Sequence, residues 1–127
     1  MRNFIISLIS LALIVSICYG FHMYSDAKTK AYDKAIETLI TEYVNENRWD
    51  EASEHFQMMQ DDWNKYKHTA SFFLDSSSIN HIDSTFKKIH YYISADDRSN
   101  ASGELAYLKG LFAALHKNES VTLENIF

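Results

Sequence analysis

Six histidines are the side chains that most readily suggest a chemical site in this sequence, because imidazole is a common zinc ligand. They lie at positions 22, 55, 68, 81, 90 and 116, and no two of them are three or four residues apart. Glu51 and His55 share one face of a helix, but a zinc ion needs at least one or two further ligands from another helix. The pattern therefore predicts no metal-binding residues.

The other reactive side chains lack the surroundings that catalysis needs. No serine is framed by glycines, no glycine-rich loop could hold a phosphate, and the one cysteine, Cys18, lies in an apolar run. The adjacent aspartates at 61–62 and 96–97 are typical of helix ends or solvated faces rather than of paired general acids. We therefore expect no catalytic or cofactor-binding residues, no cofactor and no enzyme activity.

An apolar run from Phe4 to Tyr24 dominates the amino-terminal part of the chain. It contains no charged residue, and about 21 helical residues span the hydrocarbon core of a bilayer, which is roughly 30 Å thick. A secretory signal has a shorter apolar core and ends in a small-x-small cleavage site, for which Ser25–Ala27 is a weak match. We expect an uncleaved transmembrane anchor over residues 1–25, with a cleaved signal or a buried core helix as the alternatives.

The orientation of this anchor follows from the lengths of chain on its two sides. Arg2 favours a cytoplasmic amino terminus, whereas Lys28, Lys30 and Lys34 on the other flank favour the opposite orientation. Only three residues precede the apolar run, and long domains translocate largely regardless of their charge. We expect a single-pass protein of the cell membrane whose soluble domain is extracytoplasmic.

The remaining residues, 26–127, have the composition of one small all-α domain. They contain all 17 acidic residues and all but one of the 12 lysines and arginines, whereas nucleic-acid binding needs clustered positive charge. Proline is absent and only three glycines occur in the chain, so long helices are not interrupted. We therefore expect a helical bundle and no nucleic-acid partner.

Apolar residues recur at three- and four-residue spacing in four stretches of this domain. The pattern predicts helices over about 26–46, 49–74, 79–95 and 98–116, with a carboxyl-terminal tail over 117–127. No helix breaker separates the anchor from the first stretch, so the transmembrane helix is expected to run into the domain as one rod. The polar segment Asp75–Ser78 predicts a turn and a helix cap.

An internal repeat appears when the sequence is shifted by 49 residues. The shift superimposes two sets of apolar residues: Ala52, Phe56, Met59, Trp63 and Tyr66 on Ala101, Leu105, Leu108, Phe112 and Leu115, and Ile40, Tyr43 and Val44 on Ile89, Tyr92 and Ile93. Asn47 falls on Asp96, and both residue types can cap the start of a new helix. We interpret the repeat as two stacked helical hairpins with tight turns, the alternative being a chance alignment of two amphipathic hairpins.

Two patterns concern the surface of this bundle. The neighbours in Phe72–Phe73 and in Tyr91–Tyr92 lie about 100° apart on a helix, so at least one of each pair is expected to be exposed. Ala106, Gly110 and Ala114 form a ladder of small residues, and glycine inside a helix costs about 0.5–1 kcal/mol relative to alanine. We expect another backbone of the bundle to approach Gly110, with self-association or a partner helix as the alternative.

Several motifs follow one another in a familiar order. After the apolar amino-terminal segment, Asn47–Ala52 opens a helix that contains Trp63, Asp96–Asp97 precedes Glu104–Lys109, and the chain ends in Leu123–Phe127. Over essentially its whole length the chain thus resembles the bacterial family called domain of unknown function 4363. The resemblance implies a small membrane-anchored helical protein, and it carries over no catalytic or binding residues.

We expect the chain to act as a membrane-anchored helical interaction module that holds its bundle near the bilayer for a protein partner, such as another integral membrane protein. The alternative is an extracytoplasmic bundle that binds a small ligand in an aromatic cavity. A cavity of several hundred Å³ with converging polar groups would favour the ligand-binding function. A filled core with exposed aromatic side chains would favour the interaction module. The sequence leaves the oligomeric state open.

Overall fold

A computed structural model shows four long helices and no strand over residues 1–126, whose backbone the structure describes; side chains are described for residues 1–117. The first helix, α1 (Arg2–Thr38), continues directly into a π-helix, η1 (Leu39–Val44). The others are α2 (Trp49–Ala70), α3 (Ser76–Ser94) and α4 (Arg98–Ile126). The predicted all-α fold class is confirmed.

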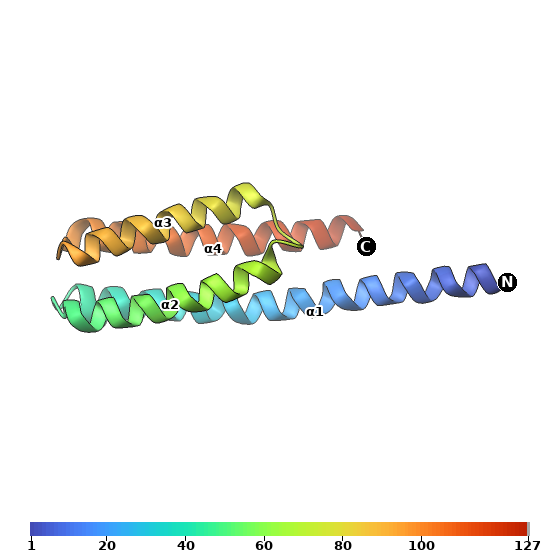
Figure 1. The fold of residues 1–127 in the computed structure, drawn as a ribbon, viewed down its shortest axis with the longest axis horizontal. Coiled ribbons are helices and arrows are strands. Elements are labelled where there is room, and N and C mark those ends of the chain that lie inside the picture. Colours follow the sequence, from blue (N-terminus) through green and yellow to red (C-terminus); the bar gives the residue numbers. More distant parts are fainter. Residues whose placement is uncertain (127) are drawn as a thin grey trace.

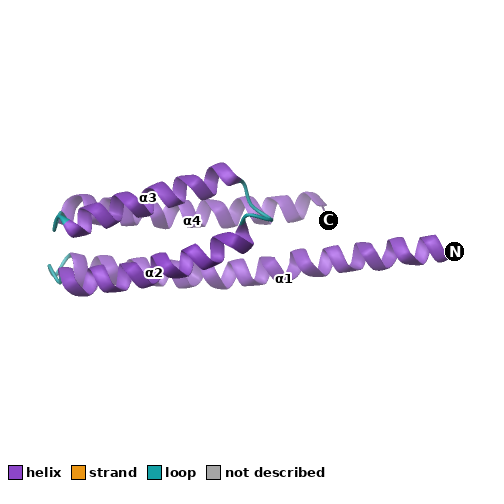
Figure 2. Cartoon of the chain, in the orientation of Figure 1, coloured by secondary structure: helices purple, strands orange, loops and turns teal. Residues whose placement is uncertain are grey.

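The helices form two antiparallel hairpins, α1 with α2 and α3 with α4, which stack so that α4 packs against α1 (Figure 1). The turns of the two hairpins lie at one end of the bundle, which we call the distal end (Figure 2). The α2–α3 turn of residues 71–75 lies at the other, proximal end. The amino-terminal part of α1 projects far beyond the proximal end, and the carboxyl end of α4 lies on the same side.

Several helix ends differ from those that periodicity predicts. Helix α2 ends at Ala70 rather than at 74, because the backbone turns at Ser71–Leu74. Helix α3 begins at Ser76 rather than at 79, because the Asp75 side chain accepts a bond from the Ser78 amide at 3.2 Å and caps the first turn. Helix α4 continues through the expected tail to Ile126, since no glycine or proline follows Gly110. Phe127 lies outside the described residues.

The core is filled by the stripes that the sequence predicts for α2 and α4, together with residues of α1, η1 and α3. Trp63 is fully buried at its centre, at 0% exposure. The buried hydrophobic residues are Phe21, Tyr32, Ile36, Leu39, Val44, Ala52, Phe56, Met59, Trp63, Tyr66, Ala70, Ile79, Ile82, Phe86, Ile89, Ile93, Ala101, Leu105, Leu108, Phe112 and Leu115. Aromatic rings from all four helices meet there, as bulky residues do in a small bundle.

The two distal turns have the same geometry. Asn47 and Asp96 both have a positive φ, of 57° and 54°. In the first turn the Arg48 amide donates to the Tyr43 carbonyl at 2.8 Å, and in the second the Asp97 amide donates to the Tyr92 carbonyl at 2.9 Å. These are Schellman motifs, so Asn47 and Asp96 end the preceding helices rather than capping the following ones as the sequence suggested. In the second turn the capping residue is Asp97, which accepts a bond from the Asn100 amide at 3.2 Å.

The π-helix marks a difference between the two hairpins. In α3 the buried residues Ile82, Phe86, Ile89 and Ile93 are spaced by four, three and four positions, whereas Tyr32, Ile36, Leu39 and Val44 are spaced by four, three and five. The wider ring of η1, in which the Asn45 amide donates to the Ile40 carbonyl at 3.0 Å, absorbs this extra residue. Leu39 rather than Ile40 is therefore the counterpart of Ile89, which corrects the alignment made from the sequence.

The projecting part of α1 is the apolar run. Within the described residues, α1 together with η1 is the one helix long and apolar enough to cross a membrane, and almost none of its apolar stretch is buried. Packing into the bundle begins at Phe21 and Ser25, which are 6% and 3% exposed. The bundle thus takes up the last turn of the segment that the sequence assigned to the anchor.

Candidate functional site

The histidines that suggested a metal site contact other kinds of partner. His55 stacks on Tyr43 at 4.6 Å between ring centroids, while Glu51 pairs with Arg48. His116 stacks on His22, and its Nε2 atom lies 3.3 Å from an Asp26 carboxylate oxygen. Over the part of the chain that the structure describes, no three His, Cys, Asp or Glu side chains are grouped to hold a metal ion. Glu51 and His55 thus each contact a different residue nearby in the sequence, Arg48 and Tyr43.

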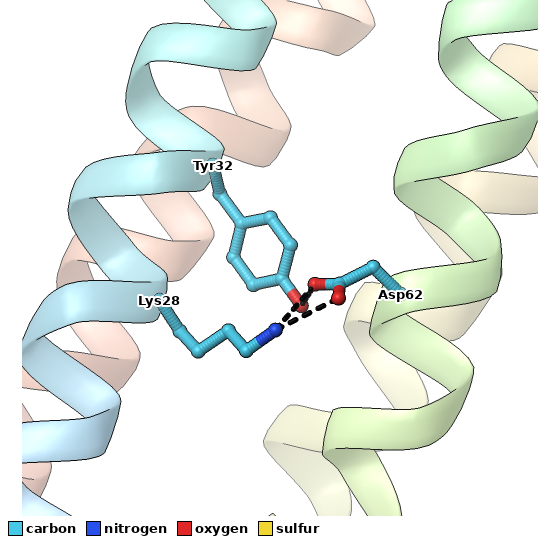
Figure 3. Close-up of polar contacts among 3 residues, drawn as sticks. All are labelled: Lys28, Tyr32 and Asp62. Atoms are coloured by element: carbon cyan, nitrogen blue, oxygen red, sulfur yellow. Dashed lines mark hydrogen bonds and ion pairs between the residues drawn. The ribbon is translucent and has the colours of Figure 1, made fainter.

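A polar cluster joins α1 to α2 on the flank of the core (Figure 3). Lys28 and Tyr32, one turn apart on α1, both point at the carboxylate of Asp62 on α2. The Lys28 ammonium lies 2.8 and 2.9 Å from the two carboxylate oxygens, and the Tyr32 hydroxyl donates to Asp62 at 2.8 Å. The three side chains satisfy one another, so the cluster ties the two helices together.

The cluster shifts the ionisation of its members. Burial, and then the bond to Asp62, raise the pKa of Tyr32 far above its usual value. For Asp62 partial burial opposes ionisation, but the bonds from Lys28 and Tyr32 outweigh it and lower the pKa of the carboxyl. Tyr32 therefore stays a neutral donor and Asp62 stays an anion at neutral pH. This pairing is stable, whereas a general acid or base needs a pKa near the working pH.

Similar bridges connect the other neighbouring helices. On α2 the Trp63 indole donates to Asp83 of α3 at 2.7 Å, and Lys67 lies 3.3 Å from the same carboxylate. Between α3 and α4, the Tyr107 hydroxyl and His81 lie 2.8 Å apart. Lys109 of α4 reaches Glu37 of α1 at 2.6 Å and Asp33 at 3.5 Å. The sequence analysis missed these bridges, because their partners belong to different helices.

A groove of about 340 Å³ runs along η1 and the end of α1. Its walls are Ala31, Lys34, Ala35, Thr38, Leu39, Tyr43 and His55. The small side chains of Ala31 and Ala35 leave the space open, and the extra residue of η1 sets the position of Tyr43 beside it. Lys34 and His55 bring polar nitrogen atoms to an otherwise mostly apolar surface.

The ladder of small residues on α4 faces away from the bundle, contrary to expectation. Gly103, Ala106, Gly110, Ala113 and Ala114 are all exposed, and we call them the outer face of α4. Nothing among the described residues lies within 4 Å of a Cβ built at Gly110 or at Gly103. The predicted close contact with another backbone of the bundle is therefore wrong, because this face of α4 has no neighbour within the described chain.

The internal repeat shows that the fold does not require these small residues. A shift of 49 residues places the outer face of α4 on an exposed face of α2 that consists of Glu54, Gln57, Asp61, Asn64 and Lys65. That face is polar and charged, as is usual for the exposed side of a bundle helix. The outer face of α4 occupies the equivalent position in the second hairpin, but it consists of glycine and alanine instead of charged and long side chains.

The exposed aromatic side chains agree with the sequence analysis. Phe72 is 85% exposed while Phe73 is partly buried, and Tyr91 is 72% exposed while Tyr92 is partly buried. One ring of each adjacent pair thus packs on the core and the other faces solvent, as predicted. Phe72 lies in the α2–α3 turn, at the proximal end, and Tyr91 lies near the distal end of α3.

Comparison with known proteins gives one match. The family model described as a domain of unknown function (DUF4363) matches residues 21–126, which cover the whole bundle from its first buried residue. No curated protein and no solved structure matches the chain.

Proposed function

Because the chain belongs to the family of the domain of unknown function DUF4363, whose description gives no activity, we propose a function from the chain's own surfaces. The chain is a membrane-anchored helical module that binds a protein partner and performs no catalysis. The projecting helix holds the bundle at the cell membrane, on the extracytoplasmic side. The outer face of α4 receives a helix of the partner.

The observation that carries this proposal is that the five residues of the outer face of α4 are all glycine or alanine, with the exposed ring of Tyr107 at their border. Glycine at an exposed helix position weakens the helix by about 0.5–1 kcal/mol relative to alanine, and Gly103 and Gly110 both occur there. Small residues at such spacing let two helix backbones approach closely. The polar counterpart face of α2 indicates that packing of the bundle does not impose this composition.

Anchoring by an uncleaved span is supported by the place where the bundle begins. Phe21 stacks on Phe73 at 4.2 Å, and Ser25 is 3% exposed. Cleavage at Ser25–Ala27 would remove both side chains from the bundle and uncover Phe73. We expect the protein to remain with membranes after carbonate extraction. Recovery of a soluble form that begins near Lys28 would contradict the anchor.

Partner binding is tested with Gly110→Leu in the full chain. The leucine side chain enters open space, so we expect the melting temperature in detergent to be unchanged or raised. The same branched side chain blocks close approach of a second helix. We therefore expect the set of proteins that co-purifies from solubilised membranes with the wild-type chain to be lost from this variant.

A matched control is Ser84→Leu, which places leucine on an exposed position of α3. This variant should keep both its melting temperature and its co-purifying proteins. Equal capture by wild-type, Gly110→Leu and Ser84→Leu chains would contradict the assignment of the outer face. Sedimentation of the purified chains distinguishes the two possible partners. If the partner is a second copy of the chain, purified wild type sediments as an oligomer and the Gly110→Leu variant does not. If the partner is another protein, the two purified chains sediment alike.

The groove beside η1 favours a second candidate function, binding of a small ligand. Its volume of about 340 Å³ suits a small molecule, and Lys34 and His55 would favour one that carries a negative charge. A bound ligand raises the melting temperature by mass action. Screening small organic anions against wild type and Ala35→Leu, which fills the groove, tests this function. Ligand binding in the groove is excluded if no compound shifts the wild-type melting temperature more than that of Ala35→Leu.

A further inference from the structure

The α2–α3 turn at the proximal end exposes a large aromatic side chain. Phe72 is 85% exposed, more than any other large hydrophobic residue described between residues 21 and 117. A single exposed hydrophobic residue needs no explanation in itself. The same part of the bundle also exposes Tyr24 of α1, which is 46% exposed and whose ring centroid lies 5.6 Å from that of Tyr66 near the end of α2.

The turn is tied to the projecting helix at the level where that helix leaves the bundle. The ring of Phe73 stacks on Phe21 at 4.2 Å with an interplanar angle of 11°. Phe21 is also the first buried residue of α1, and it lies in the last turn of the apolar run. A span formed by that run therefore places residues 71–74 at the boundary between hydrocarbon and headgroups.

The distribution of charge agrees with this placement. Residues 71–74 are uncharged, and Asp75, the one charged residue of the turn, caps α3. Acidic residues gather instead around the two distal turns: Glu42, Glu46, Asp50, Glu51, Glu54, Asp96 and Asp97. Arg48 and Arg98 are the basic residues closest to them in sequence. Since the surface of a membrane that contains anionic lipid repels negative charge, the bundle is favoured with its distal end away from the bilayer.

We infer that the α2–α3 turn is a lipid-contact site, with the Phe72 ring inserted among the phospholipid headgroups beside the anchor. Aromatic and aliphatic side chains are favoured at this depth, where interfacial helices bury Phe and Leu. The bundle then touches the bilayer at two points, the α1 span and the turn, so its orientation relative to the membrane is fixed. This inference rests on the membrane anchor of the proposed function and not on the protein partner.

The test places a fluorescent reporter at Phe72 in the full chain. Cys18 is the one cysteine of the sequence, so Cys18→Ser gives a background in which single cysteines can be labelled with a nitrobenzoxadiazole dye. Phe72→Cys reports on the turn, Leu13→Cys on the span, and Tyr91→Cys is a matched control, because Tyr91 is an exposed aromatic residue near the distal end. The chains are inserted into vesicles of phosphatidylcholine and phosphatidylglycerol.

Quenching by nitroxide lipids and by aqueous iodide then locates each dye. At position 72 we expect strong quenching by lipids labelled near the headgroup, and iodide quenching several-fold weaker than at position 91. A dye at 72 that iodide quenches as readily as at 91 overturns the inference, and so does one protected from both quenchers, which would indicate a protein contact. Lipid quenching at position 13 in the same series shows that the anchor stands even when the inference fails.

Discussion

The two hairpins of the bundle use the same turn and the same buried stripe but differ by one residue. From Tyr32 to Val44 the first hairpin has one position more than the second has from Ile82 to Ile93, and η1 absorbs it. The turns that follow are both Schellman motifs. The chain thus tolerates an inserted residue by widening one helical turn, and the groove lies beside that turn.

The hairpins also differ on their outer sides and in their polar contacts. The first hairpin carries the charged face of α2 and the Lys28, Tyr32 and Asp62 cluster, whereas Tyr32 has the apolar Ile82 as its counterpart in the second. The second hairpin carries the neutral outer face of α4. What the two hairpins share is therefore what the fold requires. Among the differences, the polar cluster ties helices together, which leaves the outer face of α4 as the candidate for function.

The largest expected effect comes from deleting one residue in each hairpin. Deletion of Thr41 should convert η1 into regular α-helix and leave a bundle that still melts cooperatively, because the buried stripe then has the spacing of α3. Deletion of His90 should abolish the cooperative melt, since the preceding part of α3 rotates by about 100° and its apolar stripe leaves the core. Both residues are exposed. Circular dichroism melts of the two variants check this, and loss of the transition in both would show that η1 is not an insertion.

Substitution of the two central rings should have the next largest effect. Trp63 and Phe112 are counterparts in the repeat, and replacing either by alanine should destabilise the bundle by about 3–5 kcal/mol through the cavity left behind. Trp63→Ala should cost about 1 kcal/mol more, because it also removes the indole bond to Asp83. Urea unfolding of the full chain in detergent measures both. Equal losses would mean that the bond to Asp83 contributes nothing net.

Much of this architecture follows from the sequence, because apolar periodicity decides which face of a helix is buried. The stripes of α2 and α4 were predicted residue by residue for that reason. The extra residue of η1 was missed because Leu39 and Ile40 are adjacent apolar residues, and periodicity alone cannot choose between them. Asp62 and Asp83 were missed because a carboxylate's partner on another helix depends on how helices pack. The contact of Gly110 inside the bundle was predicted wrongly, because the spacing of small residues does not show whether their face is turned toward the bundle or toward solvent.

A smaller effect should appear at alkaline pH, and Tyr32 of the first hairpin should contribute to it. Burial and the bond to Asp62 raise the pKa of Tyr32 above its usual value of 10.0. Because the pKa of Tyr32 is higher in the folded than in the unfolded chain, the stability that its neutral hydroxyl contributes is fully present below pH 10.0. This contribution is lost as the pH rises above 10.0, because the unfolded chain then releases a proton that the folded chain retains.

Tyr32→Phe is the variant that isolates this contribution. Its unfolding free energy should be lower near neutral pH by about 0.5–1.5 kcal/mol for the lost hydrogen bond. It should also fall less steeply above pH 10.0 than that of the wild type. Urea titrations across this range measure both differences. Identical alkaline slopes would show that Tyr32 ionises as easily in the folded as in the unfolded chain.

The smallest expected effect distinguishes the outer face of α4 from its charged counterpart on α2. Gly110→Ala should stabilise the bundle by about 0.5–1 kcal/mol, because alanine favours the helix and its Cβ meets nothing within 4 Å. The counterpart change in α2, Asp61→Ala, removes an exposed carboxylate that accepts a bond from Gln57 and should shift stability by no more than about 0.5 kcal/mol. A destabilised Gly110→Ala chain would mean that another part of the molecule packs on the outer face of α4. A stabilised variant that also loses its partner would show that glycine is kept there for binding at the expense of stability.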